Sequence, residues 1–190
     1  MSMLSAPASS TTRARQLSWQ VGAVVAGSII LALSSYIEVP MAPVPITMQT
    51  LAVTLAGGIL GRRLGALTVM AWLAQGMAGL PVLAGGAGGI HHFAGPTAGY
   101  LAAFPIMAWM TGWLAESGWN GLRPWRAFAG MLGAHLLCLA LGGAWLAGIV
   151  GPTQAVGLGV TPFLVGAVLK SALGAALLAL LARRRPRKVA

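Results

Sequence analysis

The sequence predicts an all-α membrane protein with six transmembrane helices and both termini in the cytoplasm. Of the 190 residues, 57% are hydrophobic and only 7% are charged, and the mean hydropathy is +0.82. Soluble domains carry about a quarter charged residues, so this composition is typical of a membrane protein. The other two observations are the series of apolar segments and the distribution of basic residues between them.

The apolar segments are long enough to count as spans. A transmembrane helix needs about 20 mostly apolar residues, and fewer where the chain is covered by protein. Six segments meet this condition: residues 19–37, 47–60, 64–80, 97–115, 125–150 and 162–182. The first of them, preceded by Arg13 and Arg15, could also be a secretory signal peptide. A retained first helix is the preferred interpretation, because the apolar run continues to Ile37 and further spans follow.

The spans define one domain with two terminal segments. Residues 19–182 are predicted to form a single six-helix transmembrane domain. Residues 1–18 are expected to be a flexible N-terminal segment, and residues 183–190 a basic cytoplasmic tail.

The basic residues indicate the orientation. The chain has twelve Lys and Arg residues against two acids, with a formal charge of +10. The expected outer loops 38–46, 81–96 and 151–161 contain no basic residue, as the positive-inside rule requires. Eleven basic residues fall on the expected cytoplasmic side: Arg13, Arg15, Arg62, Arg63, Arg123, Arg126, Arg183, Arg184, Arg185, Arg187 and Lys188. Because they lie between spans and form no surface stripe, no nucleic-acid binding is expected.

The twelfth basic residue, Lys170, lies inside the sixth predicted span. At 1.5 Å per residue it is about 12 Å below the outer boundary. An ionisable group at this depth usually faces a polar cavity or a partner. Lys170 is therefore predicted to be a cation at the base of an outward-opening pocket, where it would bind an anion or a carbonyl oxygen. Snorkelling toward the outer surface is the alternative.

Two expected outer loops are suited to close such a pocket. Residues 38–46 contain three prolines, which favour a stiff, extended lid. Gln49 and Thr50 follow just inside the next span, where polar groups need partners. The other loop has four glycines between residues 85 and 89, which permit close approach of the backbone to a ligand. A plain flexible connection is the alternative for this loop.

Neither a metal site nor an active site is expected. His91 and His92 have no acidic or cysteine neighbours, and His135 is predicted deep in another helix. The two adjacent histidines are interpreted as polar loop residues, of which His91 is a candidate ligand contact. With only two acids in the chain, acid–base catalysis is hard to build, so no enzyme and no cofactor are predicted. The only candidate pair for an intramembrane enzyme is Lys170 with His135.

Two further features concern partner chains. The sequence contains no G-x-x-x-x-G-K-[ST] phosphate-binding loop, so ATP hydrolysis of that kind would need another protein. In the first span Gly22 pairs with Ala26, and Ala23 pairs with Gly27, each at a spacing of four. Such small residues allow close helix packing against a partner or a neighbouring helix, although the pattern is common in membrane proteins rich in glycine and alanine.

Five stretches together resemble one known family. They are PVPITMQTLAV around Gln49, GRRLGAL (61–67), GLPVLAGGAGG (79–89), GPTAGYLAAFP (95–105) and PFLVGAVLK (162–170). In this order they are similar to the BioY family, the biotin-specific S components of energy-coupling factor (ECF) vitamin transporters. The similarity extends from about residue 20 to residue 182, and the central stretches up to residue 105 are its most specific part.

The resemblance implies a fold, a location and partners. It implies a six-helix S-component fold in the bacterial cell (inner) membrane, with a biotin pocket near the outer face closed by the loops after helices 1 and 3. It also implies a transmembrane T component and a pair of ABC-type ATPases as partners. By the same resemblance, Gly22, Ala23, Ala26 and Gly27 pack against the T component.

The resemblance also implies a set of substrate-binding residues. They are Lys170, Gln49, Thr50, Gly86, Gly88, His91 and Tyr100, with Tyr100 covering an apolar part of the ligand. The family often has an acid three residues before the lysine, whereas this chain has Ala167. An acceptor for the ureido N–H groups is therefore missing at that position. Gln49, a backbone carbonyl or His91 would replace it, or the ligand would bind more weakly or differ.

The sequence thus predicts a substrate-binding membrane component for biotin uptake, without catalysis of its own. The same fold binding another small vitamin or carboxylic acid is the first alternative. An intramembrane enzyme and an assembly protein are weaker alternatives, since the first lacks catalytic groups and the second does not explain a buried lysine.

Overall fold

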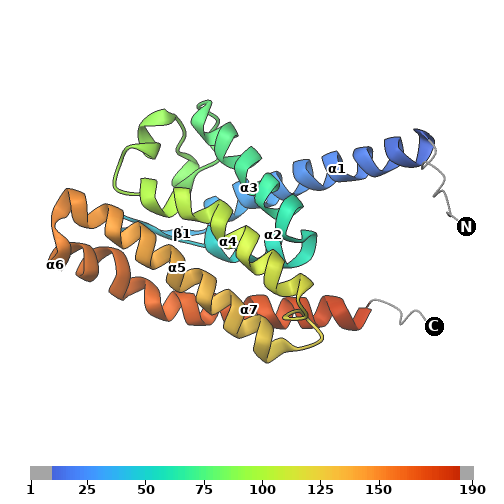
Figure 1. Ribbon diagram of the computed structural model, residues 1–190. Helices are drawn as coiled ribbons and strands as arrows, with labels where there is room; N and C mark the ends of the chain where they lie inside the picture. Colours follow the sequence, from blue (N-terminus) through green and yellow to red (C-terminus); the bar gives the residue numbers. More distant parts are fainter. Residues whose placement is uncertain (1–9, 185–190) are drawn as a thin grey trace, which may run out of the picture.

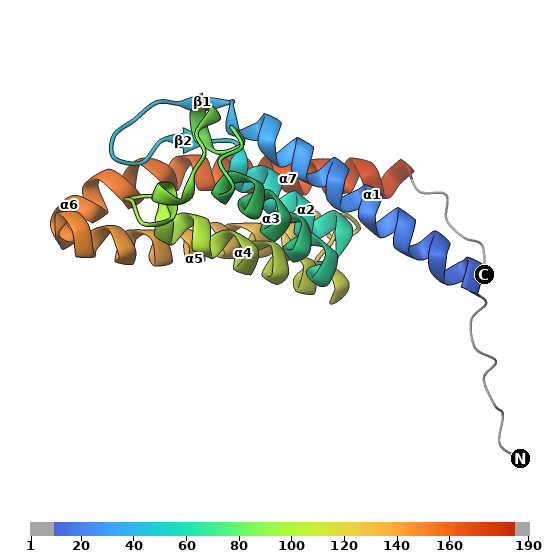
Figure 2. The ribbon, with the colours of Figure 1, turned by 90° about the horizontal axis from the view of Figure 1, so that it is seen from above.

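The computed structural model describes residues 10–184, and in this range the chain is almost entirely helical. The helices run side by side in an elongated bundle (Figures 1 and 2). The long helices are α1 (Ser10–Ser35), α2 (Gln49–Leu60), α3 (Arg62–Met77), α4 (Ala98–Glu116), α5 (Pro124–Val150) and α7 (Thr161–Arg184). The short elements are β1 (Glu38–Val39), β2 (Ile46–Thr47), η1 (Ala84–Gly86), η2 (Ile90–Phe93), α6 (Pro152–Ala155) and η3 (Val156–Val160).

The predicted helical class is confirmed, and α2 to α5 begin and end within three residues of the predicted spans. Helix α1 differs, because it begins at Ser10 and not at residue 19. Residues 10–18, predicted to belong to a flexible segment, are helical. Residues 13–20, RARQLSWQ, contain neither glycine nor proline, so nothing in them interrupts the helix. Residues 1–9 lie outside the described range.

The expected loop 151–161 is also helical, which corrects the sequence prediction. Gly151, with φ of +86°, ends α5, and Pro152 occupies the first turn of α6, where its missing N–H costs nothing. The chain then passes through the π-helical turn η3 directly into α7. Because Pro162 has no N–H to donate, the hydrogen-bond pattern of a regular α-helix cannot continue through this point.

The C-terminal end of α7 also differs from the prediction. This helix continues to Arg184 and so includes Arg183 and Arg184, which were expected in the tail. The remaining basic residues of the predicted tail, Arg185, Arg187 and Lys188, lie outside the described residues.

Among residues 10–184, three helical segments are long and apolar enough to cross a membrane: Thr12–Ser35, Pro124–Val150 and the continuous Pro152–Arg184. Helix α2 is apolar but shorter. The segment Thr12–Ser35 is barely covered by the rest of the chain, and its large apolar side chains, Trp19 and Ile30 among them, are exposed. Such a surface is stable against lipid or another protein. Together with three segments long enough to cross a bilayer, it identifies the chain as a membrane protein.

Helix α4 lies at the centre of the packing, against α2, α3 and α5. Its Phe104 stacks on the buried Trp72 of α3 with ring centroids 6.0 Å apart. Close approach of the helices depends on small residues, because a methyl group at Gly57 of α2 would overlap the carbonyl oxygen of Ala108. The helices therefore pack at backbone contact, as is usual for membrane bundles.

The connections between helices gather at two ends of the bundle (Figures 1 and 2). The hairpin end comprises the β1–β2 hairpin, the connection carrying η1 and η2, and the α5–α6 turn. The basic end comprises the start of α1, the α2–α3 turn, the α4–α5 connection and the end of α7. The described basic residues other than Lys170 belong to these latter segments: Arg13, Arg15, Arg62, Arg63, Arg123, Arg126, Arg183 and Arg184.

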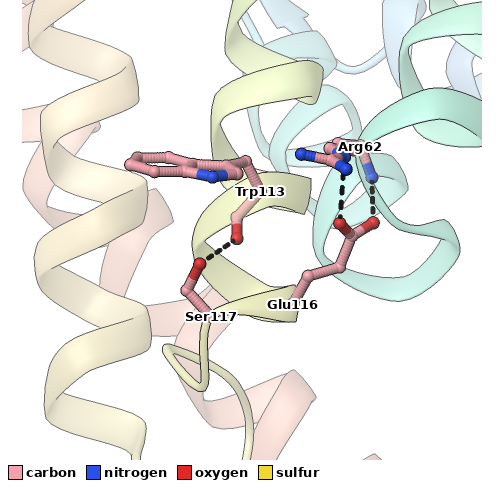
Figure 3. Close-up of polar contacts among 4 residues, drawn as sticks. All are labelled: Arg62, Trp113, Glu116 and Ser117. Atoms are coloured by element: carbon pink, nitrogen blue, oxygen red, sulfur yellow. Dashed lines mark hydrogen bonds and ion pairs between the residues drawn. The ribbon is translucent and has the colours of Figure 1, made fainter.

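At the basic end, Glu116 joins α4 to α3 (Figure 3). Its carboxylate accepts a hydrogen bond from the backbone N–H of Arg62 at 2.9 Å and pairs with Arg62 Nε at 3.2 Å. A negative charge at the first residue of α3 complements the helix dipole. Ser117 Oγ donates to the carbonyl of Trp113 at 2.9 Å, where α4 ends (Figure 3). These contacts fix the basic end, far from the hairpin.

Candidate functional site

A cavity of about 370 Å³ lies at the hairpin end of the bundle. Its lining comes from the hairpin segment, α2, the α3–α4 connection, α4, α5 and α7. The volume falls in the range of about 300–1,000 Å³ typical of sites for small organic molecules. Among the described residues that line it, none is Asp or Glu. The cavity is therefore mostly apolar, with a few polar groups.

Lys170 supplies the charge in this cavity. Its Nζ donates to the backbone oxygen of Thr47 at 2.5 Å and to Thr50 Oγ1 at 3.2 Å. Both acceptors are neutral, and the lining offers no carboxylate to balance the ammonium. A cation in this setting attracts an anionic or strongly polar oxygen of a ligand.

Gln49 holds the hairpin in place beside this lysine. Its side chain is 4% exposed, its Nε2 donates to Ser35 Oγ at 2.8 Å, and its Oε1 accepts from Thr47 Oγ1 at 3.0 Å. The end of α1, the end of β2 and the start of α2 are thereby linked. Gln49 lines the cavity, and its hydrogen bonds also position Thr47, the acceptor for Lys170.

Aromatic rings form an apolar wall. Tyr100 of α4 stacks on Phe163 of α7 with ring centroids 6.3 Å apart, and Phe104 lies one turn further along α4. The hydroxyl of Tyr100 donates to the carbonyl oxygen of Gly159 at 2.7 Å, within the π-helical turn. Because this bond occupies the hydroxyl proton, Tyr100 can contact a ligand through its ring but does not donate a hydrogen bond to it.

The α3–α4 connection is anchored at three points, so it is more than a plain flexible linker. Tyr36 Oη donates to the carbonyl of Pro81 at 2.6 Å, and Trp72 Nε1 donates to Val82 at 2.9 Å. Trp145 Nε1 donates to the carbonyl of Gly95 at 2.9 Å. Side chains from α3, from α5 and from Tyr36, which directly follows α1, thus hold the connection over the cavity.

His91 and His92 lie on η2 of this connection, and both line the cavity. Their ring centroids are 4.1 Å apart. Partial burial and, to a smaller extent, the charge of His91 lower the pKa of His92. His92 is therefore neutral at neutral pH and can offer one donor and one acceptor.

Five of the predicted substrate-binding residues line the cavity: Lys170, Gln49, Thr50, His91 and Tyr100. Gly86 and Gly88 do not, so their predicted contact with a ligand is not supported. Gly86, with φ of +77°, packs against the ring of Tyr36, and Gly88 packs against the backbone carbonyl of Leu80. The glycines serve a tight turn, while Ala84 and Ala87 line the cavity.

Several lining residues were missed by the sequence prediction. Phe104 and Phe163 carried a usable signal, since they stand four residues after Tyr100 and seven before Lys170, on the same helical faces. His135, Cys138 and Leu139 of α5 also line the cavity. Their own spacing shows that they share a face, but only the fold shows that this face meets the cavity.

The small residues of α1 divide into two groups. Gly22 and Ala26 are exposed, and a methyl group at Gly22 would meet nothing within 4 Å. Ala23 is half-buried. Gly27 packs against α3, where a methyl group would lie 2.6 Å from Thr68 Cγ2. The predicted partner contact is thus compatible with Gly22 and Ala26, whereas Gly27 serves packing within the chain.

Within residues 10–184 no three His, Cys, Asp or Glu side chains are grouped so that they could hold a metal ion. His91 and His92 have no third ligand of this kind beside them.

Comparison with known proteins places the chain in a family. A model of the BioY family matches residues 7–187. The probable biotin transporter BioY of Pyrococcus horikoshii is 39% identical over 143 residues, which cover 75% of this chain and 83% of the relative. The biotin transporter BioY of Rhizobium etli is 40% identical over 157 residues, covering 78% and 83%.

A solved structure shares the fold. The crystal structure of the S-component for biotin from an ECF-type ABC transporter aligns with a TM-score of 0.79 over 94% of this chain and 96% of that one. The two sequences are 23% identical, so this likeness concerns the fold. Together with the family model and the relatives, it leads to one conclusion: the chain is a member of the BioY family.

Proposed function

We propose that the chain is the substrate-binding S component of a biotin uptake system. The observation that carries the proposal is the cavity in which Lys170 stands as a cation among neutral acceptors and aromatic rings. The names of the relatives, biotin transporters, supply the ligand. They are transport proteins, and so we assign this chain binding and transport without catalysis or a cofactor.

The chemistry of the cavity suits biotin. Biotin combines a polar ureido ring, an apolar sulfur-containing ring and an anionic valerate tail. Lys170 and Thr50 provide N–H and O–H donors for an oxygen of the ligand. The faces of Tyr100 and Phe163 cover the apolar ring, and His91 offers a polar group near the hairpin end. The hairpin and the α3–α4 connection close the cavity over the ligand.

We infer the orientation from the distribution of charge. We place six spans in the bacterial inner membrane, with both termini and the basic end in the cytoplasm and the cavity open to the outside. Support comes from the basic residues, which gather at one end of the bundle and are missing from the segments of the hairpin end.

We propose that partner chains energise the transport step. The sequence has no phosphate-binding loop of the Walker type, so ATP hydrolysis of that kind would need another protein. The structural neighbour is named as an S-component of an ECF-type ABC transporter. We propose a transmembrane T component and ABC-type ATPases as partners, with the exposed face of α1 around Gly22 and Ala26 as the docking surface.

One observation favours a second candidate ligand class. Ala167 lines the cavity three residues before Lys170, where the family resemblance implies an acid, and the alanine side chain offers a ligand no acceptor. The same cavity would then bind another small carboxylic acid or vitamin through Lys170.

Calorimetric titration of the purified protein in detergent tests both candidates. Biotin is compared with lipoic acid, which has a valerate tail and a sulfur ring but no ureido group. We expect tight binding of biotin and binding of lipoic acid weaker by at least about 100-fold, since a site built for hydrogen bonds rejects a ligand without them. Equal affinities, or no binding of biotin by folded protein, would contradict the assignment.

A further inference from the structure

His135 of α5 is a buried polar residue with an unused hydrogen-bonding atom. Its side chain is 3% exposed, and the residue lines the cavity. Its Nδ1 lies 2.9 Å from the carbonyl oxygen of Met131 and 3.1 Å from Ser171 Oγ. Its Nε2 is buried and has no hydrogen-bond partner among the described residues. Leaving such an atom unpaired is costly, so a partner is expected when the cavity is filled.

The neighbours of His135 determine which nitrogen carries the proton. The carbonyl of Met131 can only accept a hydrogen bond. The single hydroxyl proton of Ser171 is donated to the carbonyl of Ala167 at 2.7 Å, so toward His135 this hydroxyl also accepts. Both neighbours require a proton on Nδ1. In the neutral ring Nε2 then has a free lone pair, and this atom is an acceptor.

The surroundings favour the neutral ring. Lys170 is adjacent in sequence to Ser171, the residue that contacts His135, and the cavity lining has no carboxylate. A second cation beside an unpaired lysine would be unfavourable in a membrane interior. The lining of the cavity therefore combines a strong donor, Lys170, with an acceptor, His135, while Ala167, which also lines it, contributes no polar side chain.

We propose that His135 Nε2 accepts a hydrogen bond from a ureido N–H of biotin, with the ureido ring bound at the floor of the cavity. A ureido group has a carbonyl acceptor and two N–H donors. It therefore matches a floor that offers both a donor and an acceptor. A carboxylate group of a ligand has acceptors only and does not match both. This inference rests on the proposed function and deepens it, because it assigns the residue that selects the ureido head of the ligand.

The first test compares two substitutions of His135. In His135→Asn, the amide nitrogen can still donate to Met131 and Ser171, but no atom replaces Nε2. In His135→Gln, the longer amide places an acceptor near the former Nε2. We expect the affinity for biotin to fall about 10-fold or more in the Asn variant and less in the Gln variant. Thermal melting verifies that each variant is folded.

The second test changes the ligand. Biotin derivatives methylated at one or the other ureido nitrogen are titrated into wild type and into His135→Asn. If His135 accepts a hydrogen bond from one of these nitrogens, a methyl group on that nitrogen strongly weakens binding to wild type. In the Asn variant, which has already lost the acceptor, the same methyl group causes little further loss of affinity. If the losses from methylation and from the substitution are independent and additive, His135 acts only through packing, and the inference is overturned.

The outcomes separate the two proposals. Absence of biotin binding to wild type overturns the proposed function itself. Tight biotin binding that is unchanged in folded His135→Asn overturns only the role of His135. If the Asn variant does not fold, titrations of wild type alone still test the inference. Equal affinity of wild type for biotin and for both methylated derivatives would rule out an essential ureido N–H contact and overturn it.

Discussion

Lys170 Nζ of α7 is bonded to the backbone oxygen of Thr47, which lies 123 residues earlier at the end of the β1–β2 hairpin. This contact connects the floor of the cavity to one of the segments that close it. A ligand oxygen that binds Lys170 shares or replaces the bond to Thr47. We therefore expect the position of the hairpin to depend on occupancy of the cavity.

The first prediction concerns the glycine behind Tyr100. A methyl group at Gly142 of α5 would overlap the ring of Tyr100. Gly142→Ala is expected to displace this ring into the cavity and weaken biotin binding by about 10-fold or more, as overpacking of a core costs about 1–3 kcal/mol. Gly148→Ala on the same helix is the matched control, since a methyl group there meets nothing within 4 Å. Equal affinities of the two variants would contradict the role of Tyr100.

The second prediction separates stability from binding. Glu116→Ala removes the acceptor for the N–H of Arg62 and the ion pair with its Nε. Both side chains are about half exposed, so we expect a loss of only about 1 kcal/mol in stability. Glu116→Gln keeps an acceptor and should lose less. Because Glu116 lies about 24 Å along α4 from Tyr100, biotin affinity should not change. Melting curves and titration of both variants measure the two effects, and an affinity that falls with either substitution would show that the two ends are coupled.

The third prediction concerns the small residues of α1. Gly22→Leu should leave folding and biotin binding intact but impair assembly with the T component, because Gly22 faces outward. Gly27→Leu should destabilise the isolated chain, because Gly27 packs against Thr68. Melting, titration and co-purification with the partner chains distinguish the two variants. A Gly22→Leu protein that assembles like wild type would remove this face of α1 from the docking surface.

The fourth prediction concerns pH. The pKa of His92 in the folded chain lies below its usual value near 6.5. As the pH falls, the imidazole of His92 is therefore protonated in the unfolded chain before it is protonated in the folded chain. The stability that a neutral His92 contributes is fully present above about pH 6.5 and declines below it. The melting temperature of wild type should therefore drop more than that of His92→Gln between about pH 7.5 and pH 5.5. Parallel curves for the two proteins would show that His92 does not titrate in this way.

Much of the fold could be predicted because helix boundaries in this chain coincide with strong local signals. Gly61 and Gly151 adopt positive φ at the ends of α2 and α5, and prolines or charges mark most other ends. The continuous run from α6 to α7 could not be predicted, since prolines and glycines usually indicate a loop. Here Pro152 begins a helix and Pro162 is accommodated next to a π-helical turn.

The site was only partly predictable for a different reason. Lys170 was found because a charge inside an apolar segment is costly, and Gln49 and Thr50 because they open a span. His135 looked like an ordinary polar residue of a helix. Its role depends on Ser171 and Met131, which saturate one side of the ring and leave the other free. Such a relationship between two helices is absent from the spacing of residues in either one.

The most direct measurement is a calorimetric titration of biotin into wild type, Lys170→Ala and the control variant Leu169→Ala. Leu169 is the adjacent residue of α7, and it is 65% exposed. We predict tight binding by wild type and by the control, and a loss of at least about 100-fold in Lys170→Ala, as expected when a partly buried, charged hydrogen-bonding partner is removed. Folded Lys170→Ala protein that binds biotin as tightly as wild type would contradict the claim that this lysine forms the binding site.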